Sequence, residues 1–167
     1  MNQRDRRTRA FHEAGHIVAA RLLGVEIAEV AVRFGPNPGF HVQTRSAGDQ
    51  ARGGLEADIQ VALAGGIAQQ IHRPQSYREF QVADDRQNAA NAAARHCLEP
   101  GNGEDGKNFR AEGDLPQEGI DLVNRLHRPT VKLIRENWLK VERVAAALLE
   151  REEITQADID EIIARTS

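Results

Sequence analysis

The residues best suited to chemistry lie near the start of the chain, where His12-Glu13-Ala14-Gly15-His16 forms an HExxH pattern. Histidines spaced by four on a helix project from one face, so both imidazoles can bind a single zinc ion at ~2.0–2.1 Å. The glutamate between them then reaches the water that zinc activates, takes its proton and delivers it to the leaving amine. The pattern therefore predicts His12 and His16 as metal ligands and Glu13 as a general base.

The same pattern also has an ordinary structural interpretation. A surface helix can carry two histidines and a glutamate by chance, and Arg9 and Glu13 would then form an i,i+4 ion pair. The helical context and a third ligand would distinguish the two interpretations, because a catalytic zinc site needs three protein ligands.

The third ligand is expected to be a histidine or a carboxylate, since the only cysteine, Cys97, cannot supply a thiolate cluster. Spacing alone does not choose among the downstream carboxylates. A carboxylate that opens a helix of small residues can pack tightly beside the two histidines, which favours the last two candidates in the chain. The candidates are Glu56, Asp58, Glu79, Asp84 and Asp85.

Most of the elements that position these residues are expected to be helical. The chain has 167 residues, 40% hydrophobic but only 4% aromatic, and 24 of them are alanine, the strongest helix former. A helix is predicted from a Thr8 cap to Leu23, with Gly24 as its left-handed C-terminal residue. Another is predicted from Leu55 to just before Pro74, with glycines in its middle where a second backbone must approach closely.

The remaining elements are marked by turn and capping signals. β-branched residues over Val25–Val32, a turn at residues 35–39 and a second strand at His41–Arg45 predict a β-hairpin. A third helix is predicted to begin near Asp84 and Asp85. Residues 99–119 form an expected flexible acidic loop. The longest helix is predicted to open at Pro129, and a last short helix follows Thr155, whose partner in an approximate capping box is Asp158.

Composition limits the class of protein. With 22 basic and 25 acidic side chains the net charge is −3, so no global field favours nucleic acid or a membrane surface. No apolar run approaches the ~18 residues of a membrane span, and one cysteine suits a reducing compartment, so a cytoplasmic location is expected. The cluster of Arg4, Arg6, Arg7 and Arg9 is interpreted as a solvated helix start, with a nucleic-acid contact as the less favoured alternative.

Several segments together resemble the zinc peptidase domain of FtsH-type membrane AAA+ proteases. His12–His16 is similar to that family's HEAGH motif, and Val61–Ala68 is similar to its Gly-Gly helix. Asp84–Arg95 resembles the helix that opens with the third ligand, and Ala145–Thr155 resembles its C-terminal helix. The register of the third-ligand helix implies Asp85 as the metal ligand.

The resemblance implies a mainly α fold: a compact helical zinc-peptidase domain, residues 1–167, with a small β-hairpin or sheet near the active site. It also implies Zn²⁺ as cofactor and hydrolysis of flexible or unfolded polypeptides. The sequence has no phosphate-binding Gly-x-x-x-x-Gly-Lys-Ser/Thr loop and no membrane span. We therefore expect a stand-alone peptidase domain, with an AAA+ unfoldase acting in trans as a possible partner; the oligomeric state stays open.

The chain departs from the family pattern near the expected site. Ile67 stands where the family has arginine, and Gln69 and Gln70 stand where it has glutamate. These changes permit an alternative, a catalytically silent zinc-binding adaptor with the peptidase fold, although a purely structural zinc has no use for Glu13. A third alternative is a regulator that binds nucleic acid through its basic N-terminus.

Overall fold

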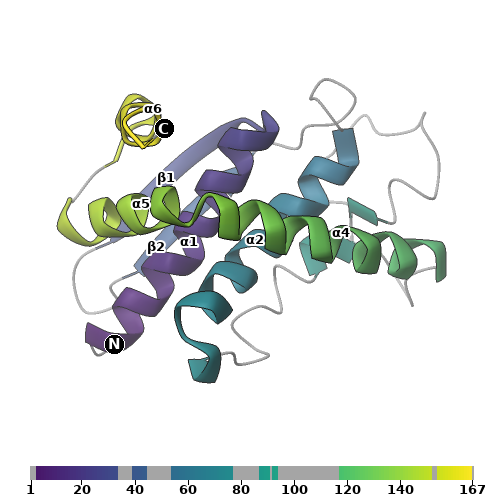
Figure 1. Ribbon diagram of the computed structural model, residues 1–167. Helices are drawn as coiled ribbons and strands as arrows, with labels where there is room; N and C mark the ends of the chain where they lie inside the picture. Colours follow the sequence, from purple (N-terminus) through teal and green to yellow (C-terminus); the bar gives the residue numbers. More distant parts are fainter. Residues whose placement is uncertain are drawn as a thin grey trace.

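The computed structural model describes residues 3–33, 39–44, 54–76, 87–90, 92–93, 117–151 and 154–166. Helices dominate this part of the chain (Figure 1). Its elements are α1 (Gln3–Leu23), β1 (Ile27–Arg33), β2 (Gly39–Thr44), α2 (Gly54–His72), the 3₁₀ turn η2 (Pro74–Ser76), α4 (Gln117–Glu136), α5 (Trp138–Glu150) and α6 (Gln156–Ala164). Residues 87–90 and 92–93 are also helical.

The centre of the fold is the pair α1 and α2, which pack along each other (Figure 1). Both helices present small or aliphatic residues at this contact, among them Ala14, Ile17, Ala64 and Ala68, all at most 5% exposed. Burial of aliphatic side chains contributes about 1.5–3 kcal/mol for each large one, and alanines let the two backbones come close. This contact determines where the side chains of the HExxH segment lie.

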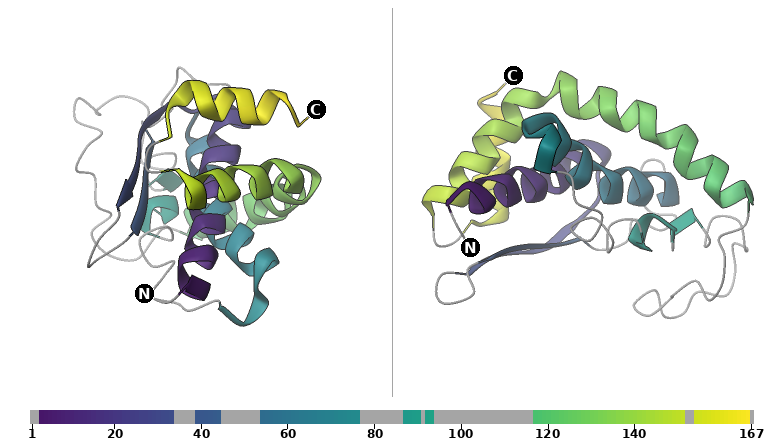
Figure 2. Two further views of the ribbon diagram at one scale, coloured as in Figure 1. Left: turned by 90° about the vertical axis from the view of Figure 1, so that its left-hand side faces the viewer. Right: turned by 90° about the horizontal axis from the view of Figure 1, so that it is seen from below.

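Two helices near the C-terminus complete the main core. Val144 and Leu148 of α5 and Ile159 of α6 are fully buried in one cluster with residues of α1 and α2. A smaller cluster joins Leu122 and Leu126 of α4 to α2 and to Ala89, Ala92 and Ala93 of the partly described third helix. Figure 2 shows α4 and α5 lying across the α1–α2 pair.

The expected fold, with a small β-hairpin or sheet near the active site, needs a correction. Mainly α is confirmed, and the interior is helical: no strand residue whose side chain is described is buried. The antiparallel strands β1 and β2 form a two-stranded ribbon at the margin of the helical body, where they contact α1 (Figure 2). Because such a ribbon is only marginally stable by itself, it depends on the helix beneath it. The contacts that hold the candidate site, described below, come from α2 instead.

Two predicted helix boundaries are wrong for identifiable reasons. Thr8 does not cap α1, which begins at Gln3; Thr8 is buried, and Arg6 donates a hydrogen bond to the backbone oxygen of Leu149, 3.3 Å away. Pro129 lies inside α4 and does not open it. Buried residues on both sides of the proline, such as Leu126 and Ile134, hold the helix in place despite the lost backbone hydrogen bond.

Other predictions are confirmed. Gly24 has the expected positive φ of 75° after α1. The Thr155 side chain accepts from the Asp158 backbone, and the Asp158 side chain accepts from the Thr155 backbone, which completes the capping box of α6. Most of the predicted acidic loop, residues 99–119, lies outside the described residues, while residues 117–119 belong to α4. Within the described part of the chain, no helix has the length and apolar character needed to cross a membrane.

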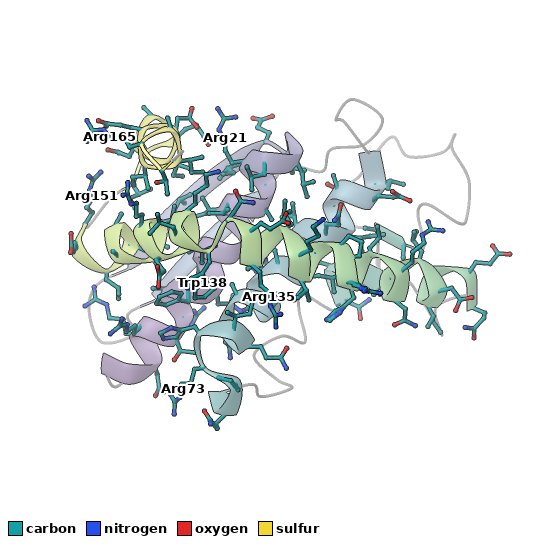
Figure 3. All side chains as sticks on the ribbon, in the orientation of Figure 1. Arg21, Arg73, Arg135, Trp138, Arg151 and Arg165 are labelled. Atoms are coloured by element: carbon teal, nitrogen blue, oxygen red, sulfur yellow. The ribbon has the colours of Figure 1, made fainter. Side chains whose placement is uncertain are left out.

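An aromatic stack joins the middle of α1 to the end of α2 and the start of α5. The ring of Phe11 in α1 lies parallel to that of His72 in α2, with centroids 3.7 Å apart, and 5.5 Å from the ring of Trp138 in α5. Trp138 extends from α5 toward α1 in Figure 3. Burial lowers the pKa of His72, as do the charges of Arg7 and Arg73, against a smaller opposing effect of Glu142. The neutral imidazole is therefore the form that suits the folded state.

The stack predicts a pH-dependent stability. Because the pKa of His72 is lower in the folded state than in the unfolded chain, the unfolded chain binds more protons below pH ~6.5, and stability falls as the pH is lowered through that range. The substitution His72→Phe keeps a stacked ring without a titrating group. Urea unfolding of both proteins at several pH values between 5 and 8 should show the wild type losing more stability toward low pH. Parallel curves for the two proteins would contradict the assignment.

Candidate metal site

Two histidine side chains of α1 converge on one point. The Nε2 atoms of His12 and His16 lie 3.2 Å apart, and the two rings stand at 80° to each other with centroids 4.8 Å apart. This follows from their spacing of four on a helix, which puts them on one face in successive turns. His12 is 8% exposed and His16 is partly buried, so solvent reaches the two rings only in part.

The other ring nitrogen of each histidine is held by α2. His16 Nδ1 lies 2.8 Å from the backbone oxygen of Val61, and His12 Nδ1 lies 3.1 Å from Oε1 of Gln69. A carbonyl oxygen can only accept a hydrogen bond, so the Nδ1 atoms carry the hydrogens. In the neutral rings, both Nε2 atoms then present lone pairs toward each other.

This arrangement fits a metal ion. Two lone pairs at 3.2 Å repel unless a cation or a proton lies between them. Nitrogens that share a tetrahedral zinc ion at ~2.0–2.1 Å are about 3.3 Å apart, close to the observed separation. Neutral imidazoles whose Nδ1–H groups are fixed by hydrogen bonds are also the usual form of histidine ligands. The donor set of His12 and His16 therefore suits Zn²⁺.

Glycine makes this geometry possible on the α2 side. The imidazole of His16 lies over Gly65, where a Cβ atom would be 2.2 Å from Nε2 and less than 3 Å from two ring carbons. At Gly15 of α1, a Cβ would be 2.6 Å from the backbone oxygen of Ala64 and 2.7 Å from the Cβ of Ala68. Both positions therefore need glycine for close approach, as the sequence predicted for the middle of α2.

Glu13 lies in α1 between the two histidines and is 8% exposed. Its Oε1 atom is 3.8 Å from Nε of Arg9, the i,i+4 ion pair expected from the sequence. Because the Arg9 side chain is half exposed, this pair adds little to stability, but it keeps a cation beside the carboxylate.

The predicted third ligand, Asp85, lies outside the described residues, as do Asp84 and Glu79. Glu56, another candidate, accepts a hydrogen bond from Arg125 of α4 at 3.1 Å. Asp58 lies in the first half of α2. Within the described residues, no group of three or more His, Cys, Asp or Glu side chains is arranged to hold a metal ion.

The helical residues that follow Asp85 are nevertheless partly placed. Ala89, Ala92 and Ala93 are buried in one cluster with Ile59 and Ala62 of α2. Ala62 is next in sequence to Val61, whose carbonyl holds His16. The chain after the predicted third ligand thus enters a helix that packs on α2. The side chains of His12 and His16, which belong to α1, contact this same helix α2.

Sequence reasoning found only part of the α2 surface that contacts the histidines. The family resemblance put Gln69 near the expected site and the glycines indicated a close contact, but no contact with His16 was expected of Val61. Val61, Gly65 and Gln69 are spaced by four and so lie on one face of α2, the face that meets His12 and His16. The spacing itself was visible in the sequence. However, this spacing does not predict a contact with the histidines until the position of α1 against α2 is known.

Comparison with known proteins gives two related sequences. The ATP-dependent zinc metalloprotease FtsH of Ruminiclostridium cellulolyticum is 25% identical over 188 residues, an alignment that covers 97% of this chain and 30% of the relative. The protein of the same name from Lachnoclostridium phytofermentans is 25% identical over 174 residues, again 97% of this chain and 30% of the relative. No family model matches the chain.

Nearly the whole chain is thus similar to a part of FtsH, and these similarities support an FtsH-related protein. The chain spans about 30% of the length of the relatives that it matches. Both relatives are named as ATP-dependent zinc metalloproteases.

The contact between His16 and Gly65 predicts a coupled effect of two substitutions. Gly65→Ala puts a methyl group where the His16 ring lies, so the ring must move, and we expect a loss of about 1–3 kcal/mol in unfolding free energy together with weaker zinc binding. In a His16→Ala background, the same Gly65→Ala change should be nearly neutral for stability. Urea unfolding of the four proteins measures this coupling, and additive effects would show that the ring does not lie over Gly65.

Proposed function

We propose that this protein is a zinc-dependent metallopeptidase that hydrolyses peptide bonds of flexible or unfolded polypeptides. The observation that best supports the proposal is the convergence of His12 and His16 Nε2 at 3.2 Å while α2 holds both Nδ1 atoms. A surface helix with two incidental histidines has no reason to have both rings oriented in this way. The similarity to FtsH zinc metalloproteases agrees with it.

In this proposal His12, His16 and Asp85 hold the metal, and Glu13 is the general base. Zinc, when bound, polarises the substrate carbonyl and lowers the pKa of water toward ~7. Glu13 accepts a proton from the attacking water and delivers it to the nitrogen of the leaving amine as the peptide bond breaks. Its buried position next to His12 suits this role, because the surrounding helices limit the access of bulk water.

The proposed substrate class follows from the activity for which the FtsH relatives are named. FtsH relatives are named as ATP-dependent. We propose that this chain acts on polypeptides that are already flexible, or on substrates that an AAA+ unfoldase delivers to it in trans.

The role of Glu13 is tested by Glu13→Gln, which keeps the size of the side chain but cannot accept the proton. We expect hydrolysis of a flexible, fluorescently labelled polypeptide to fall by at least about 10²–10⁴-fold, the usual contribution of a general base, while stoichiometric zinc is retained. Arg9→Gln serves as a control, because it changes the neighbour of Glu13 and leaves the base in place. Zinc binding without any cleavage by the wild type would favour the silent adaptor over the peptidase.

The choice of third ligand is tested on neighbouring carboxylates. Asp85→Asn should abolish stoichiometric zinc binding, measured by atomic emission on the purified protein, because a neutral amide oxygen is a poor zinc ligand. Asp84→Asn makes the same chemical change one residue earlier and should retain zinc. Equal loss in both variants, or loss only in Asp84→Asn, would show that Asp85 is not the ligand.

A further inference from the structure

We infer that Gln69 is the positioning residue for His12 and that its uncharged amide gives the site a lower zinc affinity than a carboxylate at this position would. The inference rests on the proposed function only in requiring zinc at His12 and His16. Gln69 is 2% exposed, and its Oε1 atom lies 3.1 Å from His12 Nδ1.

The hydrogen bond has two consequences for the ligand. First, it keeps the hydrogen of His12 on Nδ1, so that Nε2 presents its lone pair toward Nε2 of His16. Second, it fixes the plane of the ring, because a bond between α1 and α2 resists rotation about χ2. A side chain of similar size without an acceptor would lose both effects and leave a buried N–H group unpaired.

The charge of the acceptor then determines how strongly the ligand binds. A carboxylate that accepts from Nδ1–H makes the imidazole more basic and hence a better ligand for zinc. Gln69 offers only an amide oxygen, and the partner of His16 is the backbone oxygen of Val61. Both histidines are thus held by neutral acceptors, and the negative charge that would favour the cation is absent at these two contacts.

The neighbouring residue provides a matched control. Gln70 is the next residue of α2 but is exposed, whereas Gln69 is buried against His12. Gln69→Glu and Gln70→Glu therefore change the net charge of the protein by the same amount, in the same helix and one residue apart. Only the first places the new charge on the hydrogen bond to the ligand.

The experiment measures metal affinity in the full chain, by competition with a chromophoric zinc chelator and by the visible spectrum of bound Co²⁺. We expect Gln69→Glu to bind zinc about 10-fold or more tightly than the wild type, and Gln69→Met to bind about 10–100-fold more weakly, with a changed Co²⁺ spectrum. Gln70→Glu and Gln70→Met should stay within about twofold of the wild type, because surface charge is screened. Circular dichroism checks that each variant is folded, and Gln69→Glu by itself decides the question if Gln69→Met is unfolded.

The possible outcomes separate this inference from the proposed function. Equal affinities for the Gln69 and Gln70 variants, in a wild type that binds zinc through His16, would overturn the inference and leave the zinc site intact. A wild type that binds no zinc, or binds it equally well after His16→Ala, would overturn the proposed function and the inference with it. Tighter zinc binding by Gln69→Glu without peptide hydrolysis would support the inference and favour the adaptor.

Discussion

The close antiparallel contact between α1 and α2 is the constraint on which the candidate site depends. It brings His16 opposite Val61 and His12 opposite Gln69, so that successive turns of α1 meet successive turns of α2 in reverse order. Side chains larger than those of Gly15 and Gly65 would separate the helices, since a Cβ at either position would lie within 2.6 Å of an atom of the other helix. The glycines lower the intrinsic stability of both helices, and the packing that they permit offsets that loss.

The electrostatics of the site follow from this contact. Because the Nδ1 atoms of His12 and His16 both contact α2, their Nε2 atoms face each other at 3.2 Å. A pair of neutral imidazoles in this arrangement is better satisfied with a cation than without one, and the adjacent Glu13 adds negative charge on the same helix. The helices of the second half of the chain pack against α1 and α2 and keep the pair in register.

Local signals in the sequence predict some helix ends correctly and others wrongly. The wrong predictions have a common cause. The capping box at Thr155 and Asp158 and the left-handed Gly24 depend on residues adjacent in sequence, and both are confirmed. Thr8 and Pro129 are equally good local signals, yet neither marks a helix start, because contacts with distant residues extend the helix through each of them. The two strands were also expected from local patterning, but their position outside the helical core is a matter of packing. Local propensity is worth tenths of a kcal/mol to about 1 kcal/mol per residue, so tertiary contacts overrule it.

The sequence by itself determined which residues of α1 share a face, because a spacing of four fixes the relative direction of His12 and His16 in any helix. It also indicated, through its glycines, that a second backbone comes close to the middle of α2. Only the tertiary structure decided that the partner of His12 is Gln69, 57 residues away, and that the partner of His16 is a backbone oxygen. These pairings depend on how far α1 is shifted along α2, and that shift is set by the burial of side chains from five helices together, which no local stretch of sequence encodes.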